Sequence, residues 1–230
     1  QFAPGHRGRF RIRLGLCGLK VGVFAPLGGN APIAPDDPSF KILEAAESQG
    51  FDLGWFGPLD AEGTVRGAFS FAAAAWVATK CVRFQLGVAV PLSSEMHPLR
   101  VAEELALLDR AAGGPLEWAA LSVSEDADRF GESIAIIEGA VTGEPLSFSG
   151  PSFTFPEITV EPGALRRIPR RTLVAEKRGA ENVFEVRAGE STRAVLLYRD
   201  TRAVPIEDLI ASQGRFLDAI AAESSEGRSA

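Results

Sequence analysis

The sequence predicts an α/β protein built on a parallel sheet, and three observations support this fold class. Between residues 20 and 123, short apolar runs typical of strands alternate with longer stretches whose apolar residues recur at helical spacing. Turns rich in glycine or proline separate these stretches. Apolar residues make up 46% of the 230 residues, which is enough for the core of one large domain. This alternation favours parallel strands joined by right-handed crossovers.

Four strands are expected in the first part of the chain, because each is a short apolar run bounded by turn residues. They occupy residues 20–25, 51–56, 82–90 and 116–123. Helices are expected after them, at residues 39–50, 69–79, 99–112 and 128–141. The first helix has Phe40, Leu43 and Ala46 at helical spacing and Gly50 as its C-terminal stop. The second is an alanine-rich run, the third stops at Gly113-Gly114 and the fourth at Thr142-Gly143.

The alternation stops after residue 141. Residues 144–160 are β-rich with a turn at Gly150-Pro151, which predicts a hairpin, and residues 161–171 are rich in proline and arginine. Three further strands are expected at residues 172–175, 182–186 and 194–198, and a closing helix at residues 206–222. We therefore expect one domain over residues 20–222, with a basic extension at 1–19 and a disordered tail at 223–230. The extension fits a solvated tail or edge strand, or an arm that contacts an acidic partner.

Composition and charge weigh against several classes of function. The net charge of −6 argues against a general nucleic-acid binder. The longest apolar run, at residues 68–78, is too short to cross a bilayer, and no signal peptide is found, so we expect a cytoplasmic protein without membrane contact. Cys17 and Cys81 are isolated, which fits reduced thiols. The two histidines and two cysteines have no metal-ligand spacing.

Five motifs, in order along the chain, resemble those of the luciferase-like flavin monooxygenases, a branch of the (β/α)8 barrels. They are KVGVFA at 20–25, AAESQGFDLGWFG at 45–57, FQLGVAVPLSSEMHPLRVAEELALLDRAAGG at 84–114, DRFGESIAIIEGAVTGEPLSFSGPSFTF at 128–155 and RRIPRRTLVA at 166–175. The resemblance implies a TIM-barrel-like fold and a reduced FMN cofactor supplied by a separate flavin reductase. It also implies oxygen chemistry on a small apolar substrate, and a homodimer.

The chain departs from the family pattern in ways that predict a barrel that is incomplete or rebuilt in its C-terminal part. Only about 55 residues follow Ala175, which is too few for three further β/α units and a closing helix. Barrels of this kind often bind phosphate with loops after the late strands, so the usual FMN phosphate site is expected to be missing. The stretch Gly57-Pro58-Leu59-Asp60 also lacks the acid-histidine group that the family often carries there.

The catalytic candidates are His97 and Asp60, which follow expected strands at the end where barrel active sites lie. His97 fits an acid, base or hydrogen-bond donor, or alternatively the cap of the helix that begins at Pro98. Asp60 occupies the family's cofactor-side position and fits an acid or base, or a solvated loop residue.

Cofactor and substrate candidates lie at the same strand ends. The cofactor candidates are Gly57, Ser93, Ser94 and Arg100; Arg100 fits a phosphate or carboxylate ligand, or an ion pair with a neighbouring acid such as Glu103 or Glu104. The substrate-pocket candidates are Phe24, Trp55 and Trp118, for which core packing is the alternative.

Three functions remain open at this point. The first is a two-component monooxygenase in which the cofactor carries the oxygen chemistry and the protein supplies a dry pocket. The second is a shortened relative without redox chemistry that catalyses a cofactor-free step such as a ring closure. The third is a protein that binds flavin or an apolar ligand without catalysis.

Overall fold

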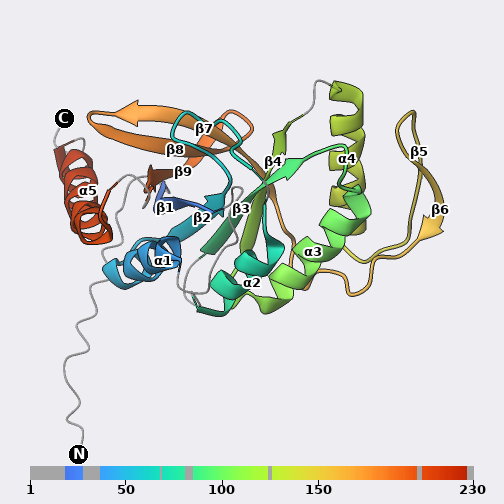
Figure 1. Cartoon of the computed structure of the whole chain (residues 1–230), viewed down its shortest axis with the longest axis horizontal. Coiled ribbons are helices and arrows are strands. Elements are labelled where there is room, and N and C mark those ends of the chain that lie inside the picture. Colours follow the sequence, from blue (N-terminus) through green and yellow to red (C-terminus); the bar gives the residue numbers. More distant parts are fainter. Residues whose placement is uncertain are drawn as a thin grey trace, which may run out of the picture.

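Seven strands form a closed barrel in the order β1-β2-β3-β4-β7-β8-β9 (Figure 1). The computed structural model describes residues 19–27, 37–67, 69–80, 85–123, 126–200 and 204–226, with the backbone alone for 221–226. The strands of the barrel are β1 (Lys20–Pro26), β2 (Leu53–Gly57), β3 (Gln85–Leu92), β4 (Leu116–Ser122), β7 (Arg170–Arg178), β8 (Glu181–Ala188) and β9 (Ser191–Tyr198). The helices are α1 (Pro38–Gln49), α2 (Phe71–Lys80), α3 (Pro98–Ala111), α4 (Ala127–Ala140) and α5 (Ile206–Glu226).

The first half of the barrel is a parallel β/α array, which confirms the α/β fold class. Strands β1 to β4 pair in parallel, and a helix follows each of them. Side chains at the helix ends explain where the helices begin: the Asp37 carboxylate accepts a hydrogen bond from the Ser39 N–H at the start of α1. Gly50, at φ 93°, ends α1 in a left-handed conformation that suits glycine.

The second half of the barrel is rebuilt as an antiparallel meander, as the short C-terminal part predicted. Strand β7 pairs in parallel with β4, β8 is antiparallel to both β7 and β9, and β9 closes the barrel in parallel with β1. The two hairpin turns contain Gly179 and Gly189 at φ 61° and 60°, where a residue with a side chain is strained. Three strands without intervening helices therefore complete the barrel.

Side chains of the strands alternate between two layers. Those that point outward pack with the helices in the larger core, which includes Val23, Phe56, Val88 and Trp118. The side chains that point inward form a second cluster, which we call the barrel interior cluster. All of its buried members except Leu59 lie on strands of the barrel. Its members are Phe24, Leu53, Trp55, Leu59, Ala89, Ala119, Phe184, Val186, Ala194, Leu196 and Tyr198. The barrel is therefore filled by side chains and is not an open pore.

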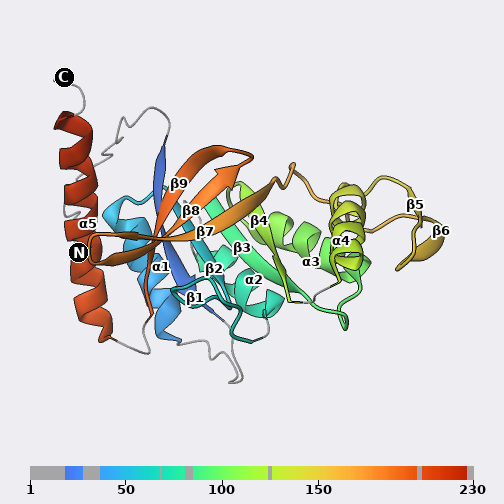
Figure 2. The ribbon, with the colours of Figure 1, turned by 90° about the horizontal axis from the view of Figure 1, so that it is seen from above.

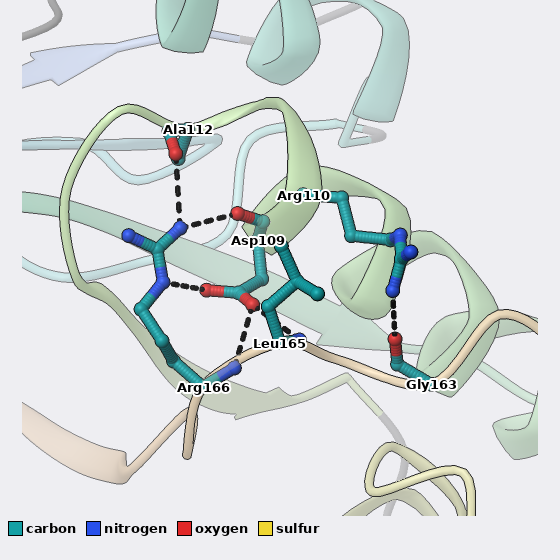
Figure 3. A network of polar contacts seen from close by, with 6 residues as sticks. All are labelled: Asp109, Arg110, Ala112, Gly163, Leu165 and Arg166. Atoms are coloured by element: carbon teal, nitrogen blue, oxygen red, sulfur yellow. Dashed lines mark hydrogen bonds and ion pairs between the residues drawn. The ribbon is translucent and has the colours of Figure 1, made fainter.

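Polar contacts on both sides of the barrel wall join the parallel half to the rebuilt half. Inside the barrel, Arg171 of β7 donates two hydrogen bonds to Glu117 of β4, at 2.9 and 2.6 Å. Outside it, the buried carboxylate of Asp109 on α3 holds the segment before β7 through Leu165 and Arg166 (Figure 3). Arginine pairs with carboxylates at both places, so the basic stretch 166–171 serves to join the two halves.

The remaining elements lie at opposite ends of the molecule in both views (Figure 1, Figure 2). Strands β5 (Leu146–Ser149) and β6 (Thr154–Ile158) form the expected hairpin as a separate two-stranded sheet beyond α4. Helix α5 packs beside α1, where Gln49 donates to the Ile210 carbonyl at 2.9 Å. It extends to Glu226, four residues beyond the end expected from the sequence. The extension at 1–18, both cysteines and residues 227–230 lie outside the described residues.

No helix within the described ranges is long and apolar enough to cross a membrane.

Candidate functional site

The carboxyl ends of β1 to β4, β7 and β9 gather at one rim of the barrel, because these strands run in the same direction. Active sites of α/β barrels lie at this rim. The described segments at this rim include the loop at residues 58–66 after β2, the loop at residues 93–97 after β3, the turn between β7 and β8, and the residues that follow β9. The last two belong to the rebuilt half.

Asp60 organises the loop at residues 58–66. Its Oδ1 accepts hydrogen bonds from the N–H groups of Glu62 and Thr64, at 3.1 and 2.8 Å, and its Oδ2 forms an ion pair with Arg66 at 2.6 Å. Partial burial raises the pKa of Asp60, but the hydrogen bonds and the Arg66 charge together outweigh that effect and lower the pKa below its ordinary value. Asp60 is therefore a carboxylate near neutral pH, held in place as the centre of the loop.

This loop covers the mouth of the barrel. Leu59 belongs to the interior cluster, Ala61 and Val65 pack against it, and the Tyr198 hydroxyl donates to the Leu59 carbonyl at 3.3 Å. Beneath the loop, the rings of Phe24 and Phe184 lie 4.8 Å apart, and the Tyr198 ring is about 6 Å from each. These rings fill the barrel interior beneath the loop, at the end of the barrel where active sites lie.

A cleft of about 540 Å³ lies at the rim, beside the aromatic rings that fill the barrel interior. We call it the rim cleft. Its walls are residues 60–62 of the loop, residues 180–182 at the β7–β8 turn, residues 198–200 after β9, and one side of α5. Its volume falls in the range of small-molecule sites, about 300–1,000 Å³. The rim cleft therefore combines the family-like half of the chain with the rebuilt half.

Arg199 is the most unusual group in the rim cleft. It is only 4% exposed, and its Nη1 donates to Glu181 at 2.8 Å and to the Tyr198 carbonyl at 3.0 Å. Its Nε and Nη2 are buried and have no hydrogen-bond partner within the part of the chain that the structure describes. Buried donors normally have acceptors, so this guanidinium has unused capacity for an acceptor. Arg215, exposed on α5, lines the same cleft.

His97 and Arg100 lie at the start of α3, outside the lining of the rim cleft. The Nδ1 of His97 accepts from the Leu99 N–H at 3.3 Å and caps α3, and the His97 ring meets the Phe153 ring edge-on at 5.5 Å. Arg100 pairs with Glu103 at 2.9 Å and with Glu104. Both side chains are exposed and have contacts that account for their orientation.

Ser93 and Ser94 contribute backbone contacts in the loop that precedes α3. The Ser93 carbonyl accepts from Met96 at 3.2 Å, and the Ser94 carbonyl accepts from the Arg129 guanidinium at 3.1 Å. Gly57 lies at the end of β2, where a Cβ would come within 2.7 Å of the Ala89 Cβ and carbonyl oxygen. The absence of a side chain at Gly57 is therefore needed for packing between β2 and β3.

The three aromatic pocket candidates divide between the two layers of the core. Phe24 and Trp55 belong to the barrel interior cluster, whereas Trp118 points outward into the helix layer. Trp55 is fully buried, and its Nε1 has no hydrogen-bond partner among the described residues. The structure thus brings Phe24 and Trp55 into the interior cluster that the Asp60 loop covers, and keeps Trp118, His97 and Arg100 apart from it.

The residues that the sequence did not single out come from the rebuilt half. Tyr198 and Arg199 follow no family motif, and only the spatial closure of β9 beside β1 brings them to the rim; Arg215 lies in the stretch 207–220, which resembles the family's last helix. One sequence signal was present: the single tyrosine of the chain ends a strand and is followed at once by Arg199-Asp200. No group of three or more His, Cys, Asp or Glu side chains that could hold a metal ion occurs in the described ranges.

Comparison with known proteins places this architecture in a family. The family model described as luciferase-like monooxygenase matches residues 20–178. The chain is 23% identical to the monooxygenase RslO1 from Streptomyces bottropensis, covering 66% of this chain and 52% of that one with a TM-score of 0.54. It is 17% identical to the coenzyme F420 dependent tetrahydromethanopterin reductase from Methanopyrus kandleri, covering 66% and 49% with a TM-score of 0.51.

The family match concerns the first part of the chain. The chain spans about half the length of these solved structures, and residues 179–230 lie beyond the family match. No curated protein sequence matches this chain. Since the family model covers more than half of the chain and the structures share the barrel fold, the chain belongs to the luciferase-like monooxygenase family.

Proposed function

We propose that this protein is a monooxygenase that takes a reduced flavin, FMN, from a separate reductase and oxidises a small, largely apolar substrate in the rim cleft. The observation that carries the proposal is the rim cleft itself: a space of about 540 Å³ at the rim where barrel active sites lie, in a chain whose residues 20–178 match a monooxygenase family. Family and fold alone do not fix an activity, so the proposal depends on this site.

The rim cleft suits a flavin-type cofactor better than the barrel interior does. Phe24, Phe184 and Tyr198 fill the interior beneath the loop. The cleft offers an apolar wall at Ala61 and Leu209 for a ring, and the unpartnered nitrogens of Arg199 for an anionic group. A reduced flavin, when bound, supplies the electrons for oxygen activation, while the protein binds the reactants and excludes water.

Asp60 is the catalytic candidate that we place beside the substrate. It lines the rim cleft and is ionised near neutral pH, so it can accept a hydrogen bond from a substrate N–H or O–H and orient that group. His97 does not line this cleft, and we propose that it acts through the position of α3. The exposed Trp76 of α2 and Leu107 of α3 support a homodimer whose partner covers them.

The test is an anaerobic titration of the purified protein with reduced FMN, followed by addition of oxygen. Quenching of fluorescence with a saturable dissociation constant, and oxygen consumption that rises when a substrate is supplied, would support the monooxygenase. Asp60→Asn should retain flavin binding and lose substrate-dependent oxygen consumption, whereas Glu190→Gln, at a distant turn, should behave as the wild type. Failure to bind reduced or oxidised FMN would refute this function.

The aromatic filling of the barrel favours a second candidate, a family member without redox chemistry. Leu59, Val65 and Tyr198 close the mouth of the barrel. This closure suits a protein that binds or cyclises an apolar ligand at the rim and needs no flavin site inside the barrel. This candidate predicts binding of apolar fluorescent probes in the rim cleft with no binding of FMN in either redox state. The titration described above therefore separates the two functions.

A further inference from the structure

We propose that the rim cleft holds an oxygen anion, either a phosphate or a carboxylate, between Arg199 and Arg215. Two sources fit this chemistry: the phosphate of the flavin, for which the inference rests on the proposed function, or an acidic group of the substrate. Both arginines lie beyond residue 178, outside the segment that the family model matches. The rebuilt half of the barrel would thus supply an anion site of its own.

Arg199 carries most of the argument. A guanidinium offers five N–H donors in a planar fork that matches two oxygens of a phosphate or carboxylate. In Arg199 only Nη1 has acceptors, so the Nε and Nη2 donors of a side chain that is 4% exposed remain unused. A charged donor that is buried without an acceptor is unfavourable, and an anion would relieve this cost.

Arg215 gives the anion its first contact. Arg215 is exposed on α5, whereas Leu209 and Phe216 of the same helix are buried. The Arg215 charge therefore faces solvent at the cleft. The unused nitrogens of Arg199 are shielded from solvent. An anion reaches them when the Arg199 guanidinium turns toward the cleft. Glu181, which pairs with Arg199 at 2.8 Å, also lines the cleft and can follow this turn.

The carboxylates of the rim cleft lower its affinity for an anion but do not prevent an anion from binding. Of the five that line it, Asp60 is paired with Arg66 and Glu181 with Arg199, and Asp200 also has an interaction partner. The other two, Glu62 and Asp208, are exposed, where solvent and salt weaken their repulsion of an anion. Removing one of these exposed charges should therefore strengthen anion binding.

The first experiment uses inorganic phosphate as the probe, with calorimetry and thermal unfolding of the full chain. Arg215→Gln should weaken phosphate binding by about tenfold. Arg193→Gln removes the same charge from the opposite end of β9 and should leave binding unchanged. Asp208→Asn should strengthen it by about twofold. Equal phosphate affinity in all four proteins, or no binding by the wild type, would overturn the inference.

The second experiment distinguishes the sources of the anion by comparing FMN with riboflavin, which has no phosphate. Tighter binding of FMN, lost in Arg215→Gln and displaced by inorganic phosphate, assigns the site to the flavin phosphate. Equal binding of the two flavins while phosphate still binds assigns it to an acidic substrate. Binding of neither flavin refutes the proposed function, and the phosphate titration still decides whether the anion site exists.

Discussion

The indole ring of Trp55 occupies the space that a side chain at Gly87 would need. The two residues are paired in register on β2 and β3, and a Cβ placed on Gly87 would overlap the ring atoms Cδ2, Cε2 and Nε1. Trp55 is fully buried at this position, in the barrel interior cluster. The largest side chain inside the barrel is thus accommodated by the smallest residue on the neighbouring strand.

Gly87→Ala should destabilise the protein by about 1–3 kcal/mol, because the new methyl group would overlap the buried ring in a close-packed core. Gly131→Ala is the matched control, since nothing lies within 4 Å of a Cβ at that exposed position on α4. Alanine is a better helix former than glycine, so this control should gain up to about 1 kcal/mol. Urea unfolding of both variants measures the difference, and equal stability would mean that Trp55 can repack.

The carboxylate of Asp109 is the anchor between α3 and the rebuilt half of the barrel. It is fully buried and accepts hydrogen bonds from the Leu165 N–H and from both the N–H and the Nε of Arg166, at 2.8 to 3.0 Å (Figure 3). Arg166 also donates to the carbonyls of Asp109 and Ala112. Every oxygen of the Asp109 side chain is therefore engaged by a donor.

Asp109→Asn should cost about 2–4 kcal/mol of unfolding free energy, because the new amide places N–H donors against the donors of Arg166. Arg167→Ala, at the next exposed arginine, should change the stability by less than about 0.5 kcal/mol. Chemical unfolding monitored by tryptophan fluorescence compares the two variants. A cost for Asp109→Asn no larger than that of the control would show that the segment before β7 is held by other contacts.

The sequence was sufficient to predict the parallel half of the fold. Apolar runs and local stop signals such as Gly50 depend on neighbouring residues alone, so strands β1 to β4 and helices α1 to α4 lie within three residues of their expected ends. The closure by a meander could not be predicted in this way. It depends on pairing between β9 and β1, more than 170 residues apart, and short strand patterns do not specify a partner.

The candidate site was predictable in part for the same reason. Asp60 lies in the loop that follows β2, so its position at the rim comes from local order along the chain. Arg199 reaches the rim only because β9 closes the barrel beside β1. The alternating pattern of a strand also does not say which layer a residue joins, so the sequence alone does not separate Trp55, which lies inside the barrel, from Trp118, which packs against the helices.

His97→Asn should leave both stability and turnover close to those of the wild type, because asparagine is a good helix cap and His97 does not line the rim cleft. His97→Ala removes the acceptor for the Leu99 N–H and should cost about 1 kcal/mol. Thermal unfolding and oxygen consumption of both variants test this. If His97→Asn folds normally and loses turnover, His97 has a catalytic role that its capping contact does not explain.

Asp60→Asn should destabilise the protein near neutral pH and have little effect in acid. Because the folded state lowers the pKa of Asp60, the carboxylate contributes stability above its unfolded pKa of about 3.9. This contribution is lost as the pH falls through the lower folded pKa. Urea unfolding between about pH 3 and pH 7 should therefore show a difference in unfolding free energy between wild type and variant, and this difference should narrow below about pH 4. Glu190→Gln, at the exposed turn between β8 and β9, should show no such difference. A difference in unfolding free energy that stays constant with pH would mean that the negative charge of Asp60 does not contribute to holding its loop.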